Sequence, residues 1–171
     1  DRLRSARTDL VDARDAVADH GEGRLETVRD AHREATSLLD RYEGTATGTG
    51  DFRAFVEFQE AFVELVEGLP DDLPTREAFE EANDLLDQRR LDEGDVARAR
   101  ELLQPAADRA GLLEERSNAE ERYETARRDA RKRLRDLDDR IDRLDRLQRL
   151  GEADLDAPVE RLRDPIESYD E

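Results

Sequence analysis

The sequence contains two histidines, His20 and His32, which are the residues best suited to general base catalysis or to nitrogen ligation of a metal. His32 lies in a charged stretch and the residue three positions before it is Arg29, so the Glu-x-x-His pattern of di-iron helix bundles is absent. His20 stands beside Gly21 and is expected at a helix seam or a helix break. Without cysteine, the chain can form neither disulfides nor thiolate metal sites. We therefore predict no catalytic residue and no metal site.

A glycine-rich segment, Gly44–Gly50, followed by Asp51 has some likeness to a phosphate-binding loop. It lacks the Gly-Lys-Ser/Thr ending of such loops, and Asp51 would place a carboxylate where the phosphate should bind. The acidic clusters Asp71-Asp72 and Asp92–Asp95 lack the alternating oxygen-ligand spacing of a calcium loop. These segments predict a linker and two capped turns, with no cofactor and no identified small-molecule substrate.

One locally basic stretch could contact nucleic acid, because a basic helix can lie along phosphates. The net charge of −18, the acidic residues that follow the stretch and the lack of aromatic residues for base stacking favour a solvated coiled-coil flank instead. A nucleic-acid-associated factor is kept as the alternative function. Its contact residues would be Arg127, Arg128, Arg131, Lys132 and Arg135.

The composition is typical of proteins adapted to high internal salt. The chain has 47 Asp and Glu against 29 Lys and Arg, and Lys132 is the only lysine. In molar salt the Debye length falls to about 3 Å, so the repulsion between carboxylates is screened. No apolar run approaches the roughly 20 residues of a membrane span, and no signal peptide is recognised. We predict a halophilic, cytoplasmic protein.

The apolar residues recur at helical spacing in two long segments. In residues 1–43 and 105–150, steps of three and four residues indicate coiled-coil seams. Gly21 and Gly23 interrupt the first segment, and we favour a continuous helix with a weak point there. The seam of the second segment is expected at Leu113, Tyr123, Ala130, Leu134, Leu137, Ile141 and Leu144.

Between these segments, residues 44–104 are expected to form a small phenylalanine-rich helical head. Asp51, Thr75 and the Asp92–Asp95 turn can cap its helices, and Pro105 is expected to restart the chain as a new helix. Gly151 should end the second long segment, and residues 151–171 should form short helices that are cut off at the end of the chain. Both ends are expected to continue into a longer protein.

The expected fold is all-α, a long antiparallel coiled-coil hairpin with the head at one end. In this register Asp15, Asp19 and Glu22 would face arginines between Arg127 and Arg135. The alternative is a compact bundle of five or six helices. The expected function is a non-catalytic interaction or scaffold module that binds a protein partner or self-associates, and Phe58 or Leu65 would then lie on an exposed surface.

Three stretches resemble one family of uncharacterised haloarchaeal helical proteins. They are Leu39–Phe52 together with Phe55–Glu60, Leu69–Pro74, and Asp156–Glu167. The resemblance implies a halophilic coiled-coil protein, and it implies no activity and no functional residues.

Overall fold

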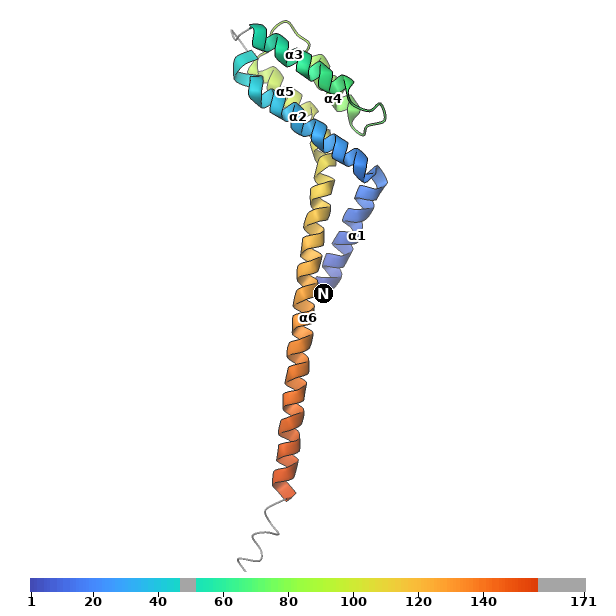
Figure 1. The fold of residues 1–171 in the computed structure, drawn as a ribbon, viewed down its shortest axis with the longest axis vertical. Helices are drawn as coiled ribbons and strands as arrows, with labels where there is room; N and C mark the ends of the chain where they lie inside the picture. The colour runs from blue at the N-terminus through green and yellow to red at the C-terminus, as the bar shows by residue number, and fades with distance from the viewer. Residues whose placement is uncertain (47–51, 157–171) are drawn as a thin grey trace, which may run out of the picture. The chain divides into compact units, whose positions relative to one another are not determined.

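The computed structural model describes residues 1–46 and 52–156, and all regular secondary structure in them is helical (Figure 1). This confirms the all-α prediction. The chain divides into two compact units, residues 1–123 and residues 124–171, which are considered separately. The helices of the described residues are α1 (Arg2–His20), α2 (Glu22–Ala46), α3 (Phe52–Glu67), α4 (Arg76–Leu86), α5 (Glu93–Leu102) and α6 (Gln104–Asp156).

Gly21 separates α1 from α2, so the expectation of one continuous first helix is wrong. Its φ of 81° lies in the left-handed region, which costs an L-residue roughly 1–2 kcal/mol and glycine almost nothing. The N–H of Gly21 donates to the carbonyl oxygens of Val17 (3.0 Å) and Ala18 (3.2 Å), which ends α1. Gly23 lies inside the first turn of α2 and is simply tolerated there.

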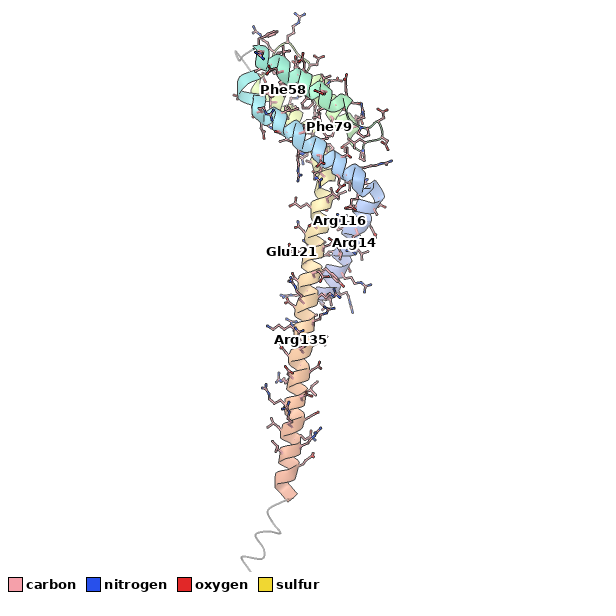
Figure 2. All side chains as sticks on the ribbon, viewed as in Figure 1. Arg14, Phe58, Phe79, Arg116, Glu121 and Arg135 are labelled. Atoms are coloured by element: carbon pink, nitrogen blue, oxygen red, sulfur yellow. The ribbon has the colours of Figure 1, made fainter. Side chains whose placement is uncertain are left out.

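The main core of residues 1–123 is formed by α2, α3, α4 and α5, with the start of α6. In α3 the buried side chains recur every four residues, at Phe58, Phe62 and Val66. Phe79 of α4 is equally buried, and Figure 2 shows Phe58 and Phe79 among these helices. The rings of Phe58 and Phe62 lie 6.0 Å apart between centroids. A complementary stripe on α2 completes the core at Val28, Ala31, Ala35, Leu38 and Leu39.

The main partner of α2 differs from the sequence prediction. Residues 22–43 were expected to pair with part of 106–150. The start of α2 does contact this segment, through Leu25 with Leu113 and Glu22 with Arg116, but α2 packs mainly along α3 and also contacts α5 (Figure 1). The spacing of its apolar residues suits either partner, and the aromatic side chains of α3 offer more apolar surface than a coiled-coil helix does. The described part of α2 also continues past residue 43, to Ala46.

The turn predictions are confirmed at Asp92–Asp95 and at Pro105, whereas Asp51, the predicted cap of α3, lies outside the described residues. Asp92 and Asp95 form a capping box at the start of α5, with each side chain accepting the other's backbone N–H at 3.0 Å. Thr75 precedes α4 but makes no capping bond. Pro105 lies in the first turn of α6, where its missing N–H needs no partner. Gly151 does not end α6, which runs on to Asp156, and the predicted helices beyond it lie outside the described residues.

α1 lies antiparallel to the first part of α6. Arg14 binds Glu120 at 3.0 Å and Glu22, at the start of α2, binds Arg116 at 2.7 Å. Val17 of α1 packs with Leu25 and Leu113, and Figure 2 shows Arg14 and Arg116 where these helices meet. The predicted pairing of Glu22 with arginines between 127 and 135 is therefore wrong.

The left-handed backbone at Gly21 gives a matched pair of variants. Gly21→Ala should lower the free energy of unfolding by about 1–2 kcal/mol, because alanine is strained at this φ. Gly23→Ala should raise it by up to about 1 kcal/mol, because a Cβ at Gly23 meets nothing within 4 Å and stiffens a helix. Urea unfolding in molar salt measures both values. Equal effects of the two variants would contradict the break at Gly21.

Burial predicts losses of folding stability of very different size for two phenylalanines of α3. Phe58→Ala should lower the free energy of unfolding by about 3–5 kcal/mol, because its ring is 2% exposed. Phe52→Ala, at a ring that is 77% exposed, should cost no more than about 1 kcal/mol. The same urea titration compares them, and a Phe58→Ala protein as stable as the Phe52→Ala protein would refute this core.

Candidate interaction surfaces

Phe58 is not an exposed contact residue, and that prediction is wrong. Its ring packs between Tyr42, 5.6 Å away between centroids, and Phe62. α3 is apolar on most of its circumference, and the stripe that faces the other helices contains Phe58. The exposed apolar side chains of α3 are Phe52 and Val63.

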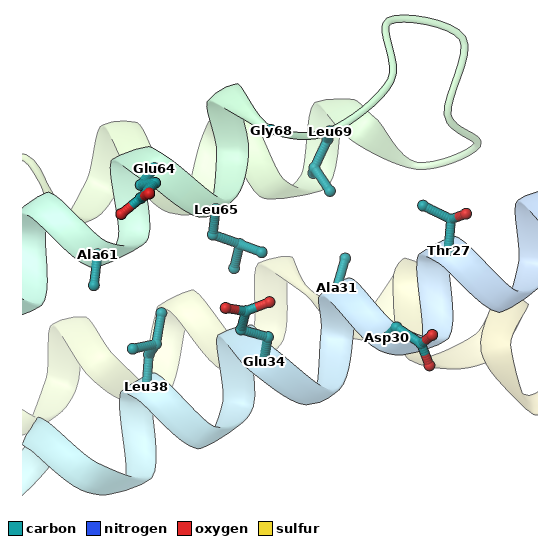
Figure 3. A pocket seen from close by; sticks show the side chains of 10 residues that line it. All are labelled: Thr27, Asp30, Ala31, Glu34, Leu38, Ala61, Glu64, Leu65, Gly68 and Leu69. Carbon is teal, nitrogen blue, oxygen red and sulfur yellow. The ribbon is translucent and has the colours of Figure 1, made fainter.

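Leu65 is half-buried against the core, so it is not an exposed anchor either. It lines an open groove of about 530 Å³ between α2 and α3 (Figure 3). The groove is lined by the carboxylates of Asp30, Glu34 and Glu64 together with leucine and alanine side chains. Throughout the part of the chain that the structure describes, no three His, Cys, Asp or Glu side chains are grouped to hold a metal ion.

The two histidines occupy separate places. His20, the last residue of α1, contacts the guanidinium of Arg109. His32 is half-buried in a second groove, of about 560 Å³, with Arg29 and Arg33 beside it and α6 opposite. Burial lowers the pKa of His32 and so favours its neutral form. Neither ring is paired with a carboxylate as in a hydrolytic triad, and the arrangement supports no particular reaction.

One ion-pair cluster fixes α5 on α2. Arg100 donates to Glu43 at 2.8 and 3.1 Å and to Asp40 at 2.8 Å. This bidentate bond holds the pKa of Glu43 below its usual value, and the two carboxylates raise the pKa of Arg100. The cluster is structural.

The basic stretch lies on one side of α6, over an arc of about 140° at 100° per residue. It includes Arg127, Arg128, Arg131, Lys132 and Arg135. The same arc carries Glu124, Asp138, Asp139 and Asp142 on the adjoining turns. Within the stretch, Arg127 binds Glu124 at 3.2 Å and Arg128 donates to Thr125 at 3.1 Å. Alternating charges on one face weaken any attraction for a phosphate backbone.

The largest exposed apolar surface of the described residues is on α6, beyond residue 130. Its side chains were predicted as a buried seam, yet none of the described residues 131–152 is buried. Two further leucines, Leu147 and Leu150, extend it, and the sequence prediction missed both, although they continue the run in steps of three. We call this surface the α6 seam: Leu134 (61% exposed), Leu137 (55%), Ile141 (55%), Leu144 (56%), Leu147 (58%) and Leu150 (67%).

The chain belongs to a family described as a domain of unknown function (DUF7118), which matches residues 3–171. This agrees with the resemblance to an uncharacterised family. Neither a curated protein nor a solved structure is detectably similar to the chain. Within residues 1–46 and 52–156, no helix combines the length and apolar content that a membrane span needs.

The Arg100 cluster predicts a pH dependence. The pKa of Glu43 is lowered from 4.5 on folding, so its contribution to stability is present above pH 4.5 and is lost as the pH falls through the folded value. Arg100→Gln should therefore destabilise the protein at pH 7 and have a much smaller effect at pH 3. Urea unfolding in low salt measures both, with Arg98→Gln, an exposed arginine of the same helix, as the control. An Arg100→Gln effect of the same size at both pH values would contradict this assignment.

Proposed function

We propose that this protein is a non-catalytic interaction module that binds a protein partner through the α6 seam. The observation that carries the proposal is the exposure of six large apolar side chains, all more than half exposed, on a helix that is otherwise charged. Proteins rarely leave a contiguous apolar surface in water unless it binds something.

The composition supports a cytoplasmic role in a halophilic, haloarchaeal cell. An excess of 18 negative charges suits a protein surrounded by molar salt, where exposed ion pairs are weak. Salt that screens charges leaves apolar contacts intact, and some salts strengthen them. An apolar seam is therefore a contact that keeps its affinity in this environment.

Site-specific photo-crosslinking in the native cells tests the proposal. A benzophenone side chain at Leu137, on the seam, should give covalent protein adducts. The same group at Asp139, two residues further on and on the opposite side of the helix, should give few. Adducts of equal yield at both positions, or none at Leu137, would refute a seam-mediated interaction.

A further inference from the structure

The part of the α6 seam from Leu134 to Leu144 follows the heptad repeat of a two-stranded coiled coil. From Ala130 the apolar residues step by four, three, four and three residues, through Leu134, Leu137 and Ile141 to Leu144. In the heptad notation a to g, this places Leu134 and Ile141 at position a. Ala130, Leu137 and Leu144 are then at position d. The stripe that these residues form is narrow, as in a pairwise seam, whereas a helix that faces a globular core has a wider apolar face. Leu147 and Leu150 lie progressively further around the helix. Leucine at d with isoleucine at one a position favours two strands.

The charges beside the seam select a parallel pair of identical helices. In a parallel, in-register dimer each g residue faces the e residue five positions later on the other chain. Arg133 would face the partner subunit's Asp138, and Arg140 would face the partner subunit's Asp145. Two-fold symmetry doubles both contacts, which gives four ion pairs of opposite charge.

In an antiparallel pair of the same helices, the charges beside the seam are less complementary. The register that overlaps the whole apolar run sets Leu134 against the partner subunit's Leu144. Arg131 would then face the partner subunit's Asp145, which is favourable. At the centre, however, Asp138 would face the partner subunit's Asp138 and Arg140 the partner subunit's Arg140. Like charges across a seam disfavour this arrangement.

The seam also has a defined end. After Ile141, the next residue at heptad position a is Gln148. After Leu144, the next residue at heptad position d is Gly151. Neither adds much apolar surface, so the match extends from Ala130 to about Leu147. Leu147 is itself a g residue and can cover the last layer of the seam.

We infer that residues 130–147 of α6 form a parallel, in-register coiled coil with a second copy of this chain. The inference rests on the proposed function of the seam and adds the identity and direction of the partner. It assigns Leu134, Leu137, Ile141 and Leu144 to the buried layers, and Arg133, Asp138, Arg140 and Asp145 to the flanking ion pairs.

Disulfide trapping in the full chain tests the direction, because the natural sequence has no cysteine. Leu137→Cys should form a disulfide-linked homodimer in a glutathione redox buffer, since d residues of parallel chains face each other within disulfide reach. Asp139→Cys, on the outside of the coil, should remain mostly monomeric. A mixture of the Leu134→Cys and Leu144→Cys variants tests the antiparallel register, in which these two positions face each other. A yield of the mixed disulfide that exceeds the yield of the Leu137→Cys homodimer would overturn the inference.

Charge reversal tests the ion pairs independently, by sedimentation equilibrium in about 0.1 M salt. The double variant Asp138→Arg/Asp145→Arg should self-associate about tenfold more weakly than the natural chain, as should Arg133→Asp/Arg140→Asp. A mixture of the two variants should recover a dimer of natural affinity. All four positions are exposed, and circular dichroism checks that helicity is retained. A mixture no tighter than either variant alone would contradict the parallel register.

The outcomes separate the inference from the proposed function. A natural chain that stays monomeric at 0.1 mM, while the Leu137 photo-crosslinker captures a different protein, would overturn self-pairing and leave the interaction module intact. Dimers that persist unchanged in Leu137→Asp/Leu144→Asp would show self-association elsewhere, and would also overturn the inference. If the natural chain forms no dimer and the photo-crosslinker at Leu137 gives no protein adduct, the inference and the proposed function are both refuted.

Discussion

The exposure of apolar side chains to water on α6 is the physical feature on which the proposed function depends. In residues 1–123 the apolar stripes of the helices cover one another, and side chains such as Phe62, Phe79 and Leu25 are fully buried. Beyond residue 130 the helix carries a similar apolar stripe, but its leucines remain more than half exposed. A single helix with such a surface gains little stability from the helix propensity of its residues alone. Most helical stability in proteins comes from the packing of an apolar face. The seam is therefore a surface that would gain stability from a second helix.

If the seam pairs as proposed, the two units have separate roles, one in folding and the other in association. Residues 1–123 contain a core of phenylalanine, leucine, valine and alanine side chains that pack against one another. Its polar contacts, such as the bidentate bond from Arg100 to Glu43, tie neighbouring helices together. The surface of residues 124–152 carries charges of both signs, arranged beside the seam in an order that distinguishes a parallel partner from an antiparallel one. In the proposed dimer these charges would contribute little affinity in high salt, so they would select the register while the leucines would provide the free energy of association.

The helical class and the capped turn at Asp92–Asp95 follow from local patterns and could be predicted. The partner of α2 could not, because the spacing of Val28, Ala31 and Ala35 fits both a coiled coil and a four-helix core. Gly21 and Gly23 look equivalent in the sequence, and only the left-handed backbone at Gly21 distinguishes them. Phe58 was misplaced because α3 is apolar on two sides and the pattern does not say which one is covered. The heptad stripe from Leu134 to Leu144 was recognised, but it was predicted to be buried, and Leu147 and Leu150 were missed. Exposure depends on what lies beside the helix in space.

Hydrogen exchange of the full chain at several protein concentrations would test the central claim most directly. If the seam gains its stability from a second helix, the backbone amides of residues 130–147 should exchange more slowly as the protein concentration rises, while those of α3 and α4 should not change. Exchange in residues 130–147 that is independent of concentration, and as fast in concentrated as in dilute protein, would contradict the account.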